Sequence, residues 1–476
     1  MNETLILEII FWFALFMVFY TYLGYGIVLY ALVKLKELFV KPVKRVLPPD
    51  SDLPEVTLFI TAFNEEDVVD EKMENSLALD YPADKLRIVW VTDGSDDGTN
   101  DRLQTHWNGK VTVYFQPKRQ GKTAAMTRGM TLVRTPLVVF TDANTMVNSE
   151  AIREIVLAFQ NPKVGCVAGE KRIAVQTKDG AAAGGEGIYW KYESTLKALD
   201  SRLYSAVGAA GELFAVRREL FEPMEPDTLL DDFILSLRIA MKGYTIAYCT
   251  NAYAIESGSA DMGEEEKRKV RIAAGGLQSI WRLLPLLNPF RYGILSFQYT
   301  SHRVLRWSVT PFLLFALLPL NIVVLLLGES PLFYGTLLGL QILFYGMGYW
   351  GYYLSTRQIK NKVLFIPYYF LFMNVNVLKG IGYLKRKSSY IFPSSSRPGW
   401  ISTHKLGFLK FSFFKSAFSA SSVCTRSVNR NISAWLLSIS KSVVLTQPGL
   451  LPLVTDLDID CEINDSKLSL FFQNFT

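Results

Sequence analysis

Long stretches without a charged residue constrain this chain more than any other feature, because a long uncharged apolar helix is stable in a lipid bilayer. The first stretch runs from Ile9 to Val33. At about 1.5 Å of rise per residue, a helix of this length crosses the roughly 30 Å hydrocarbon core. A cleaved signal peptide is the alternative, but the stretch is longer than the apolar part of a signal and lacks preceding basic residues. We therefore predict a transmembrane anchor with a basic flank over residues 1–45.

The charges beside this anchor predict its orientation. Basic residues follow it at Lys34, Lys36, Lys41, Lys44 and Arg45. Flanks rich in Lys and Arg stay on the cytoplasmic side of a membrane. We therefore expect an integral protein of the plasma (inner) membrane, with the next block, residues 46–284, in the cytoplasm.

Three more uncharged runs follow that block, at residues 308–328, 330–356 and 363–378. The first two are long enough to span a bilayer, whereas the third is short and contains Asn374 and Asn376. We expect two or three membrane helices within residues 308–390. The third run either spans the bilayer or lies at its surface.

Two segments flank these runs. Residues 285–307 mix aromatic, aliphatic and Arg side chains, which suits a helix in the headgroup layer and equally an ordinary buried helix. From residue 391 to 476 the chain becomes rich in Ser and loses its periodic pattern. We expect this atypical tail to carry no chemistry.

The thiol and imidazole content excludes some kinds of site. The four Cys residues lie far apart without a CxxC spacing, and the three His residues are scattered. A thiolate or imidazole metal centre is therefore not expected, and acid–base chemistry falls to carboxylates.

The cytoplasmic block alternates between two patterns. Strand-like apolar runs occupy Val56–Phe63, Leu86–Thr92, Val111–Phe115 and Leu137–Thr141. Helical patterns separate them at residues 66–79, 97–106, 120–133 and 149–160. This alternation predicts an α/β fold with a parallel sheet, in which ligands bind at the carboxyl ends of the strands.

Polar residues stand at those strand ends. Asn64 and Glu65 follow the first strand, and Asp93 follows the second. Asp93 begins an Asp- and Gly-rich stretch that is either a simple turn or a place where a carboxylate accepts a hydrogen bond from a base or a ribose. Asp142 and Asn144 follow the fourth strand. They are either an Asx turn or two oxygen ligands for Mg²⁺ or Mn²⁺ bridged to a diphosphate.

Other candidates lie nearer helices. Lys122 follows a glycine ahead of a helical stretch, where it serves a phosphate or a sugar unless it is merely solvated. Asp231 and Asp232 begin another helical stretch; they either cap it or form a pair in which one pKa is raised, as suits a general base. Arg268 and Arg271 belong to a basic run that either clamps a diphosphate or faces solvent and lipid.

Together these motifs resemble those of membrane-bound family 2 glycosyltransferases, which include polysaccharide synthases. The resemblance implies the α/β GT-A fold, a Rossmann-like mixed sheet. The resemblance covers residues 10 to 385 and excludes the tail. It is carried by the ordered set Phe63-Asn64-Glu65-Glu66, Asp93 in TDGSDDGT, Asp142 in TDAN, Asp232 in LDDF, and Arg271.

The resemblance implies a role for each of these residues. Asn64, Glu65 and Asp93 would line the nucleotide pocket, Asp142 and Asn144 would hold Mg²⁺ or Mn²⁺, and Asp232 would be the general base. Arg271 takes the place of the Arg in the family's Gln-x-x-Arg-Trp motif. The catalytic set is then Asp231, Asp232 and Arg271, and the set that binds the nucleotide sugar is Asn64, Glu65, Asp93, Lys122, Asp142 and Arg268.

Two departures from the family pattern are visible. Asn144 replaces the usual second Asp, and Arg271 lacks both the Gln and the Trp of its motif; nearby, Gln278-Ser279-Ile280-Trp281-Arg282 inverts the last two residues.

The implied activity is inverting transfer of a sugar, from a UDP-linked donor, to a glycan or lipid-linked acceptor at the cytosolic membrane face. Three alternatives remain open at this point: a processive polysaccharide synthase, a transferase that adds a single sugar, and an inactive membrane scaffold that binds nucleotide sugar. The expected partners are this donor, the acceptor and the lipid bilayer, and no nucleic acid. The implied glycosyltransferase site requires Asp93, Asp142 and Asp232 to surround one pocket.

Overall fold

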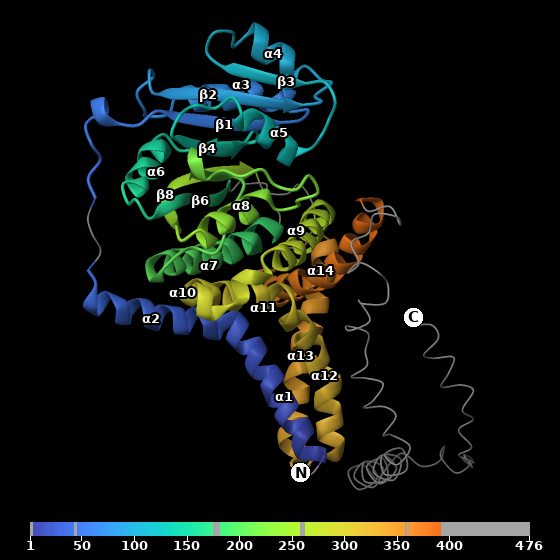
Figure 1. Ribbon diagram of the computed structural model, residues 1–476. Coiled ribbons are helices and arrows are strands. Elements are labelled where there is room, and N and C mark those ends of the chain that lie inside the picture. Colours follow the sequence, from blue (N-terminus) through green and yellow to red (C-terminus); the bar gives the residue numbers. More distant parts are fainter. Residues whose placement is uncertain are drawn as a thin grey trace, which may run out of the picture. The chain divides into compact units, whose positions relative to one another are not determined.

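A β-sheet forms the centre of the block over residues 46–284 in the computed structural model (Figure 1). The structure describes residues 3–41, 45–174, 181–257, 262–357, 359 and 361–391. All of them belong to the unit Met1–Ser396. The Ser-rich tail, apart from its first residue, lies outside the described residues, so its expected lack of chemistry remains a prediction.

The described part of the sheet has eight strands in the order β3-β2-β1-β4-β7-β6-β8-β5. Its first half is parallel: β1 pairs with β2 and with β4, and β2 pairs with β3. These four strands confirm the sequence prediction to within one residue at each end. Their bounds are β1 Val56–Ala62, β2 Leu86–Asp93, β3 Thr112–Gln116 and β4 Leu137–Asp142.

The second half makes the sheet mixed, which confirms the Rossmann-like mixed sheet that the resemblance implied. β7 runs antiparallel to both β4 and β6, and β5 runs antiparallel to β8, whereas β6 and β8 are parallel. β6 contains three consecutive charged residues, and β8 mixes polar and apolar residues over 13 positions, so neither is a short apolar run like the first four strands. The bounds are β5 Thr145–Val147, β6 Val164–Ala174, β7 Leu213–Arg217 and β8 Thr245–Ser257.

Helices cover both faces of the sheet, because successive strand residues point to opposite sides. Phe59, Phe140 and Phe214 pack in one core with helices α5 and α8, and Leu58 and Val139 pack in the other core with α3 and α6. The bounds of these helices are α3 Val69–Leu77, α4 Thr99–Thr105, α5 Lys122–Met130, α6 Ala151–Phe159, α7 Ala181–Leu203, α8 Asp231–Met241 and α9 Met262–Arg282. Short 3₁₀ turns occupy Asp50–Asp52, Glu66–Val68, Arg218–Leu220 and Leu284–Leu287.

The N-terminal apolar segment forms two helices in place of one straight anchor. A π-helical turn, Tyr20–Gly24, separates α1 (Glu3–Phe19) from α2 (Tyr25–Phe39), and the helix changes direction there (Figure 1). Phe11 on α1 packs with Leu317 of a C-terminal helix, whereas α2 packs on α7 through Leu29 and Leu196. The predicted anchor is therefore shared between the helical bundle and the sheet domain.

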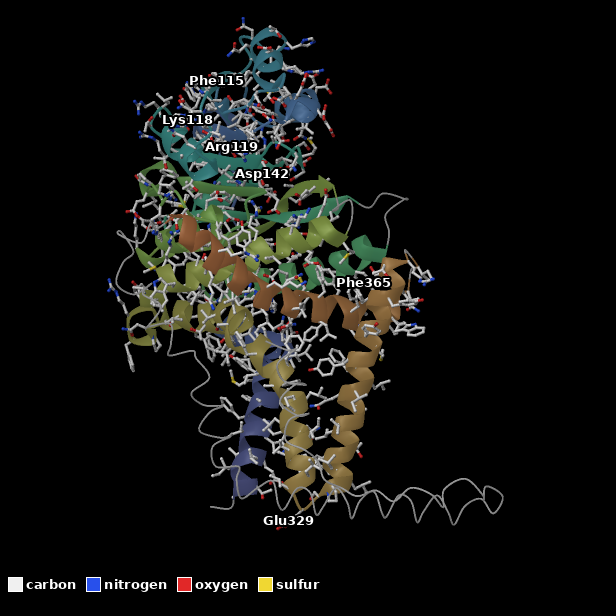
Figure 2. All side chains as sticks on the ribbon, turned by 90° about the vertical axis from the view of Figure 1, so that its right-hand side faces the viewer. Phe115, Lys118, Arg119, Asp142, Glu329 and Phe365 are labelled. Carbon is white, nitrogen blue, oxygen red and sulfur yellow. The ribbon has the colours of Figure 1, made fainter. Side chains whose placement is uncertain are left out.

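Three C-terminal helices follow: α12 Val309–Leu327, α13 Pro331–Thr356 and α14 Lys362–Ile391. Among the described residues, three stretches are long and apolar enough to cross a membrane: Thr4–Phe39, Val309–Leu327 and Val363–Arg386. The tyrosine- and glycine-rich α13 is not one of them, although we expected it to span and it runs beside α12 (Figure 1). The loop at Glu329 lies at the far end of this helix pair from Asp142 (Figure 2).

The segment over residues 285–307 is helical and partly buried, and its expected place in the headgroup layer remains a prediction. It contains α10 (Pro289–Tyr299), a π-helical turn at Thr300–Val304 and the short α11 (Leu305–Trp307). Leu295 and Tyr299 are buried in the core, while Phe290 is fully exposed. One face of α10 therefore packs on the domain and the other presents apolar surface.

Candidate active site

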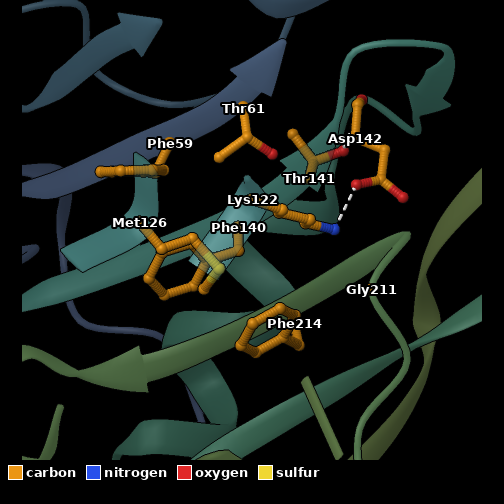
Figure 3. Close-up of a pocket in the computed structure, with 9 residues that line it drawn as sticks. All are labelled: Phe59, Thr61, Lys122, Met126, Phe140, Thr141, Asp142, Gly211 and Phe214. Carbon is orange, nitrogen blue, oxygen red and sulfur yellow. Dashed lines mark hydrogen bonds and ion pairs between the residues drawn. The ribbon is translucent and has the colours of Figure 1, made fainter. Parts of the chain in front are cut away.

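A small hollow opens where β4 ends (Figure 3). Phe59, Phe140, Phe214 and Met126 form its apolar side, and polar groups from several elements close it. Its lining residues are Phe59, Thr61, Lys122, Met126, Phe140, Thr141, Asp142, Gly211 and Phe214. Asp142 is the last residue of β4, so the strand places its carboxylate at the sheet edge where α/β proteins bind ligands.

Gly211 marks the point where the polar groups converge. A Cβ atom added to this glycine would lie 3.4 Å from Lys122 Nζ, 3.6 Å from Asp232 Oδ2 and 3.8 Å from Asp142 Oδ2. Three groups from three separate elements therefore surround one point. A glycine at this position lets the three groups approach one another without an intervening side chain.

Lys122 links the acidic residues of the site. Its Nζ lies 2.7 Å from Asp142 Oδ1 and 3.8 Å from Asp231 Oδ2. Burial by itself would lower the pKa of Lys122, but attraction by Asp142 and then by Asp231 outweighs burial and raises it above its ordinary value. The lysine therefore stays cationic and offers a positive charge to an anionic group in the hollow.

Asp231 and Asp232 are the first two residues of α8. Burial raises the pKa of Asp232 to about 7, and repulsion from Asp231 adds to the rise, while Lys122 opposes it. A carboxylate with that pKa is suited to accept a proton near neutral pH. This is the behaviour expected of a paired carboxylate at the start of this helix.

Asp93 occupies the end of β2, but it is not among the residues that line the hollow. Its buried Oδ2 accepts hydrogen bonds from the backbone N–H groups of Gln120, at 2.8 Å, and Gly121, at 2.6 Å. Arg128 Nη1 lies 3.4 Å from the other oxygen. In the described structure Asp93 thus fixes the loop that leads into Lys122, and it reaches the hollow only through this loop. The expectation that three aspartates surround one pocket is therefore met by Asp142 and Asp232 and not by Asp93.

Asn64 and Glu65 lie in the turn after β1. Asn64 has a positive φ of 54°, which Asn tolerates, and its amide exchanges two hydrogen bonds with Asp96, at 2.7 and 3.1 Å. Burial raises the pKa of Glu65, and the negative charges of Asp142 and Asp97 raise it further. Glu65 therefore belongs electrostatically to the site, whereas the Asn64 side chain is engaged in holding the turn.

The remaining predicted residues lie around this centre. Asn144 and Arg271 are exposed. Arg268 lies 3.4 Å from Glu256 and 3.7 Å from Glu265, so it belongs to an ion-pair network on β8 and α9. The structure thus brings Lys122, Asp142, Asp231 and Asp232 together and leaves Asn144, Arg268 and Arg271 outside the hollow.

Sequence reasoning assigned no role to Glu212 and Lys171, which lie directly behind Gly211. Lys171 Nζ lies 2.6 Å from Glu212 Oε1 and also pairs with Glu256, and the Lys171 side chain is only 2% exposed. Burial would raise the pKa of Glu212, but Lys171 and then Arg268 lower it to about 2. No local signal identifies Lys171, because its partners are far away in the sequence.

The fit of a divalent cation depends on oxygen ligands. Among the described residues, no group of three or more His, Cys, Asp or Glu side chains has the arrangement of a metal site. Asp142 nonetheless keeps Oδ2 turned to the point beside Gly211, and Asn144 follows in the same turn. Asp142 thus has an oxygen available for Mg²⁺ or Mn²⁺ if diphosphate oxygens complete the coordination, whereas the exposed Asn144 lies outside the hollow.

Comparison with known proteins identifies the class. Residues 54–275 match the family model described as "Glycosyltransferase like family 2", so this part of the chain is a family 2 glycosyltransferase domain. The matched segment contains the hollow and every predicted site residue.

Two relatives and one solved structure give the nearer comparison. The chain is 27% identical over 248 residues to the poly-beta-1,6-N-acetyl-D-glucosamine synthase of Staphylococcus aureus (strain MSSA476), over 49% of this chain and 58% of that protein. It is 25% identical over 256 residues to the probable glycosyltransferase YdaM of Bacillus subtilis (strain 168), with the same coverage. The chain therefore spans less than two thirds of the length of these curated relatives.

The solved structure is the mannosyltransferase PcManGT from Pyrobaculum calidifontis in complex with GDP-Man and Mn²⁺. It has a TM-score of 0.59 and 21% identity, and the match covers 79% of this chain and 98% of that one. This likeness confirms the GT-A fold that the motifs implied.

Proposed function

We propose that the protein transfers a sugar from a UDP-linked nucleotide sugar to a glycan or lipid-linked acceptor, with inversion, at the cytosolic face of the plasma membrane. The observation that carries this proposal is the approach of Lys122, Asp142 and Asp232 to one point beside Gly211. A cation, an oxygen ligand and a carboxylate of raised pKa are the groups that displacement of a diphosphate by a hydroxyl requires.

In this mechanism Asp232 accepts the proton of the acceptor hydroxyl as that oxygen attacks the anomeric carbon of the donor. The pKa of about 7 leaves a large fraction of Asp232 deprotonated at neutral pH while keeping it basic enough to accept the proton. Asp231 and Lys122 set this value by opposing effects.

The leaving diphosphate needs positive charge on the other side of the anomeric carbon. Lys122 supplies one such charge. Asp142 and Asn144 would hold Mg²⁺ or Mn²⁺, which when bound neutralises the charge that develops on the diphosphate. The Mn²⁺ and GDP-Man in the mannosyltransferase complex support this assignment.

The membrane helices suggest which acceptor is used. The apolar stretches Thr4–Phe39, Val309–Leu327 and Val363–Arg386 would hold the domain against the bilayer, where a lipid-linked acceptor or a growing polymer is accessible. The poly-beta-1,6-N-acetyl-D-glucosamine synthases among the relatives support processive synthesis of a polysaccharide. The altered Arg271 motif supports the alternative, addition of a single sugar.

The test uses purified full-length protein in lipid vesicles. We expect UDP release with one member of a panel of UDP-sugars when Mg²⁺ or Mn²⁺ is present, and the length of the product separates processive from single addition. GDP-mannose serves as the comparison donor. Binding of UDP-sugars without any turnover would instead favour an inactive scaffold.

The general base is tested by Asp232→Asn. This change should lower the rate by about 10²–10⁴-fold, because general base catalysis is worth about that much. Binding of UDP, measured by calorimetry, should remain. Full activity of the variant would refute the role of Asp232.

A further inference from the structure

The second half of α9 contacts the segment that leads into the Asp231–Asp232 pair. Gln278 Oε1 accepts a hydrogen bond from the backbone N–H of Leu229, at 3.0 Å. Gln278 Nε2 donates to the backbone carbonyl of Asp227, at 3.0 Å, and to its carboxylate, at 3.3 Å. One side chain therefore binds this segment at three atoms.

Arg282, one helical turn further along α9, binds the same segment. Its Nη2 donates to Asp227 Oδ1 at 2.6 Å, and its Nη1 donates to Thr228 Oγ1 at 2.8 Å. The side chains of Arg282 and Asp227 are 16% and 18% exposed, so the ion pair is mostly shielded from water. A charge-assisted pair in such surroundings is stronger than a surface salt bridge.

Close packing removes the space in which this segment could move. A Cβ atom on Gly275 of α9 would lie 2.6 Å from Leu230 Cγ and 3.0 Å from Leu229 Cβ. The backbone of α9 therefore touches the residues directly ahead of Asp231. Further along, Phe233 contacts the Trp307 ring at 5.1 Å between centroids.

We propose that Gln278 and Arg282 are positioning residues that fix where α8 begins, and thereby aim Asp232 at the point beside Gly211. The inference rests on the proposed function, since it assigns these two residues to the same base. Asp232 lies only three positions beyond Leu229, so a shift of the bound segment moves its carboxylate directly. A misplacement of about 1 Å costs on the order of 10²-fold in rate.

The experiment compares Gln278→Ala, Arg282→Ala and Arg282→Lys in full-length protein in vesicles. We expect both Ala variants to lower kcat by roughly 10- to 100-fold, with the donor KM within about twofold, because Asp232 acts on the acceptor proton. The Arg282→Lys variant should retain part of the kcat that Arg282→Ala loses, because Lys keeps the positive charge but cannot make both hydrogen bonds. The acidic limb of the kcat–pH profile should move to lower pH, since a displaced Asp232 gains solvent and burial is the main cause of its raised pKa.

Arg153→Ala is the matched control. Arg153 also pairs with aspartates, Asp50 at 2.7 Å and Asp80 at 2.9 Å, but it belongs to α6 on the other face of the sheet. It should leave kcat and the pH profile unchanged. If Arg282→Ala does not fold, Gln278→Ala and Arg282→Lys test the same inference.

Two outcomes would overturn the positioning role of Gln278 and Arg282, and both can be distinguished from a failure of the proposed function. An active wild type with unaltered kcat and pH profile in the variants would remove the positioning role alone. An increase in donor KM at constant kcat would do the same, because it would assign the pair to donor binding. A wild type without turnover of any nucleotide sugar would instead overturn the proposed function on which the inference rests.

Discussion

The titration of Asp232 should control the rate near neutral pH. A base works only when it has lost its proton, so kcat should rise with pH through about 7, the value to which burial and Asp231 raise the pKa of Asp232. Asp231→Asn removes a negative neighbour and should move the midpoint to lower pH. Lys122→Gln removes a positive neighbour and should move it to higher pH. Initial rates of UDP release from about pH 5 to 9 measure both shifts, and shifts of the same sign would contradict this account.

The pair between Lys171 and Glu212 should matter for stability more than for chemistry. Lys171→Met leaves Glu212 and Glu256 without their buried cation and should cost roughly 3–5 kcal/mol, seen as a lower melting temperature. Lys242→Met, which removes an exposed pair with Glu222, is the control and should cost at most about 1 kcal/mol.

The same pair also predicts a pH dependence of stability. Because the folded pKa of Glu212 is lowered to about 2, its contribution is complete above the ordinary pKa of Glu and is lost as the pH falls toward about 2. Equal melting temperatures for Lys171→Met and Lys242→Met would contradict the stabilising role of the pair between Lys171 and Glu212.

At the level of single residues, sequence reasoning anticipated those side chains whose position follows from local structure. Asp142 ends a short apolar strand and Asp232 begins a helix, and both local signals are visible in the sequence. The burial of Lys171 and the use of Asp93 to hold Gln120 and Gly121 depend on distant partners. Such long-range pairings leave no mark in the local pattern.

Among the elements, α9 and α14 should depend on close helix packing. A Cβ atom on Gly380 of α14 would lie 2.9 Å from both Ala273 Cβ and the Ala274 backbone nitrogen of α9. Gly380→Leu should therefore push the helices apart and lower both the melting temperature and kcat, because α9 also contacts the segment ahead of Asp231.

The matched control for this packing prediction is on the same helix. Nothing lies within 4 Å of a Cβ atom on Gly382, so Gly382→Leu should be neutral or slightly stabilising. Comparable losses at Gly380 and Gly382 in thermal melts and rate assays would show that the contact between the helices is not the cause.

Elements were predictable where pattern and length agreed. The first four strands are short apolar runs bounded by turns, and they were located correctly. β6, with 11 residues, is interrupted by charged side chains such as Glu170 and Lys171, and β8, with 13 residues, mixes polar and apolar residues, so neither gives such a run. The bend at Tyr20–Gly24 was also missed, because the segment stays apolar through the π-helical turn and contains no proline.

For the whole molecule, the orientation in the membrane is the main prediction. Cysteines introduced at Glu329 and Lys110 should report opposite sides in a background that keeps only the buried Cys166 of the four native cysteines. A membrane-impermeant maleimide should label Glu329→Cys on intact cells and Lys110→Cys only after lysis, because the basic flanks hold the domain inside. Labelling of Lys110→Cys on intact cells would reverse the proposed topology.

The bare backbone at Gly211 has a practical consequence. A methyl group there would rest in ordinary van der Waals contact with its three polar neighbours, so Gly211→Ala would fill the vacant space without disturbing the fold. The alanine form would keep every charge and place a methyl group where Lys122, Asp142 and Asp232 meet. Its turnover would therefore measure how closely those three groups must approach one another.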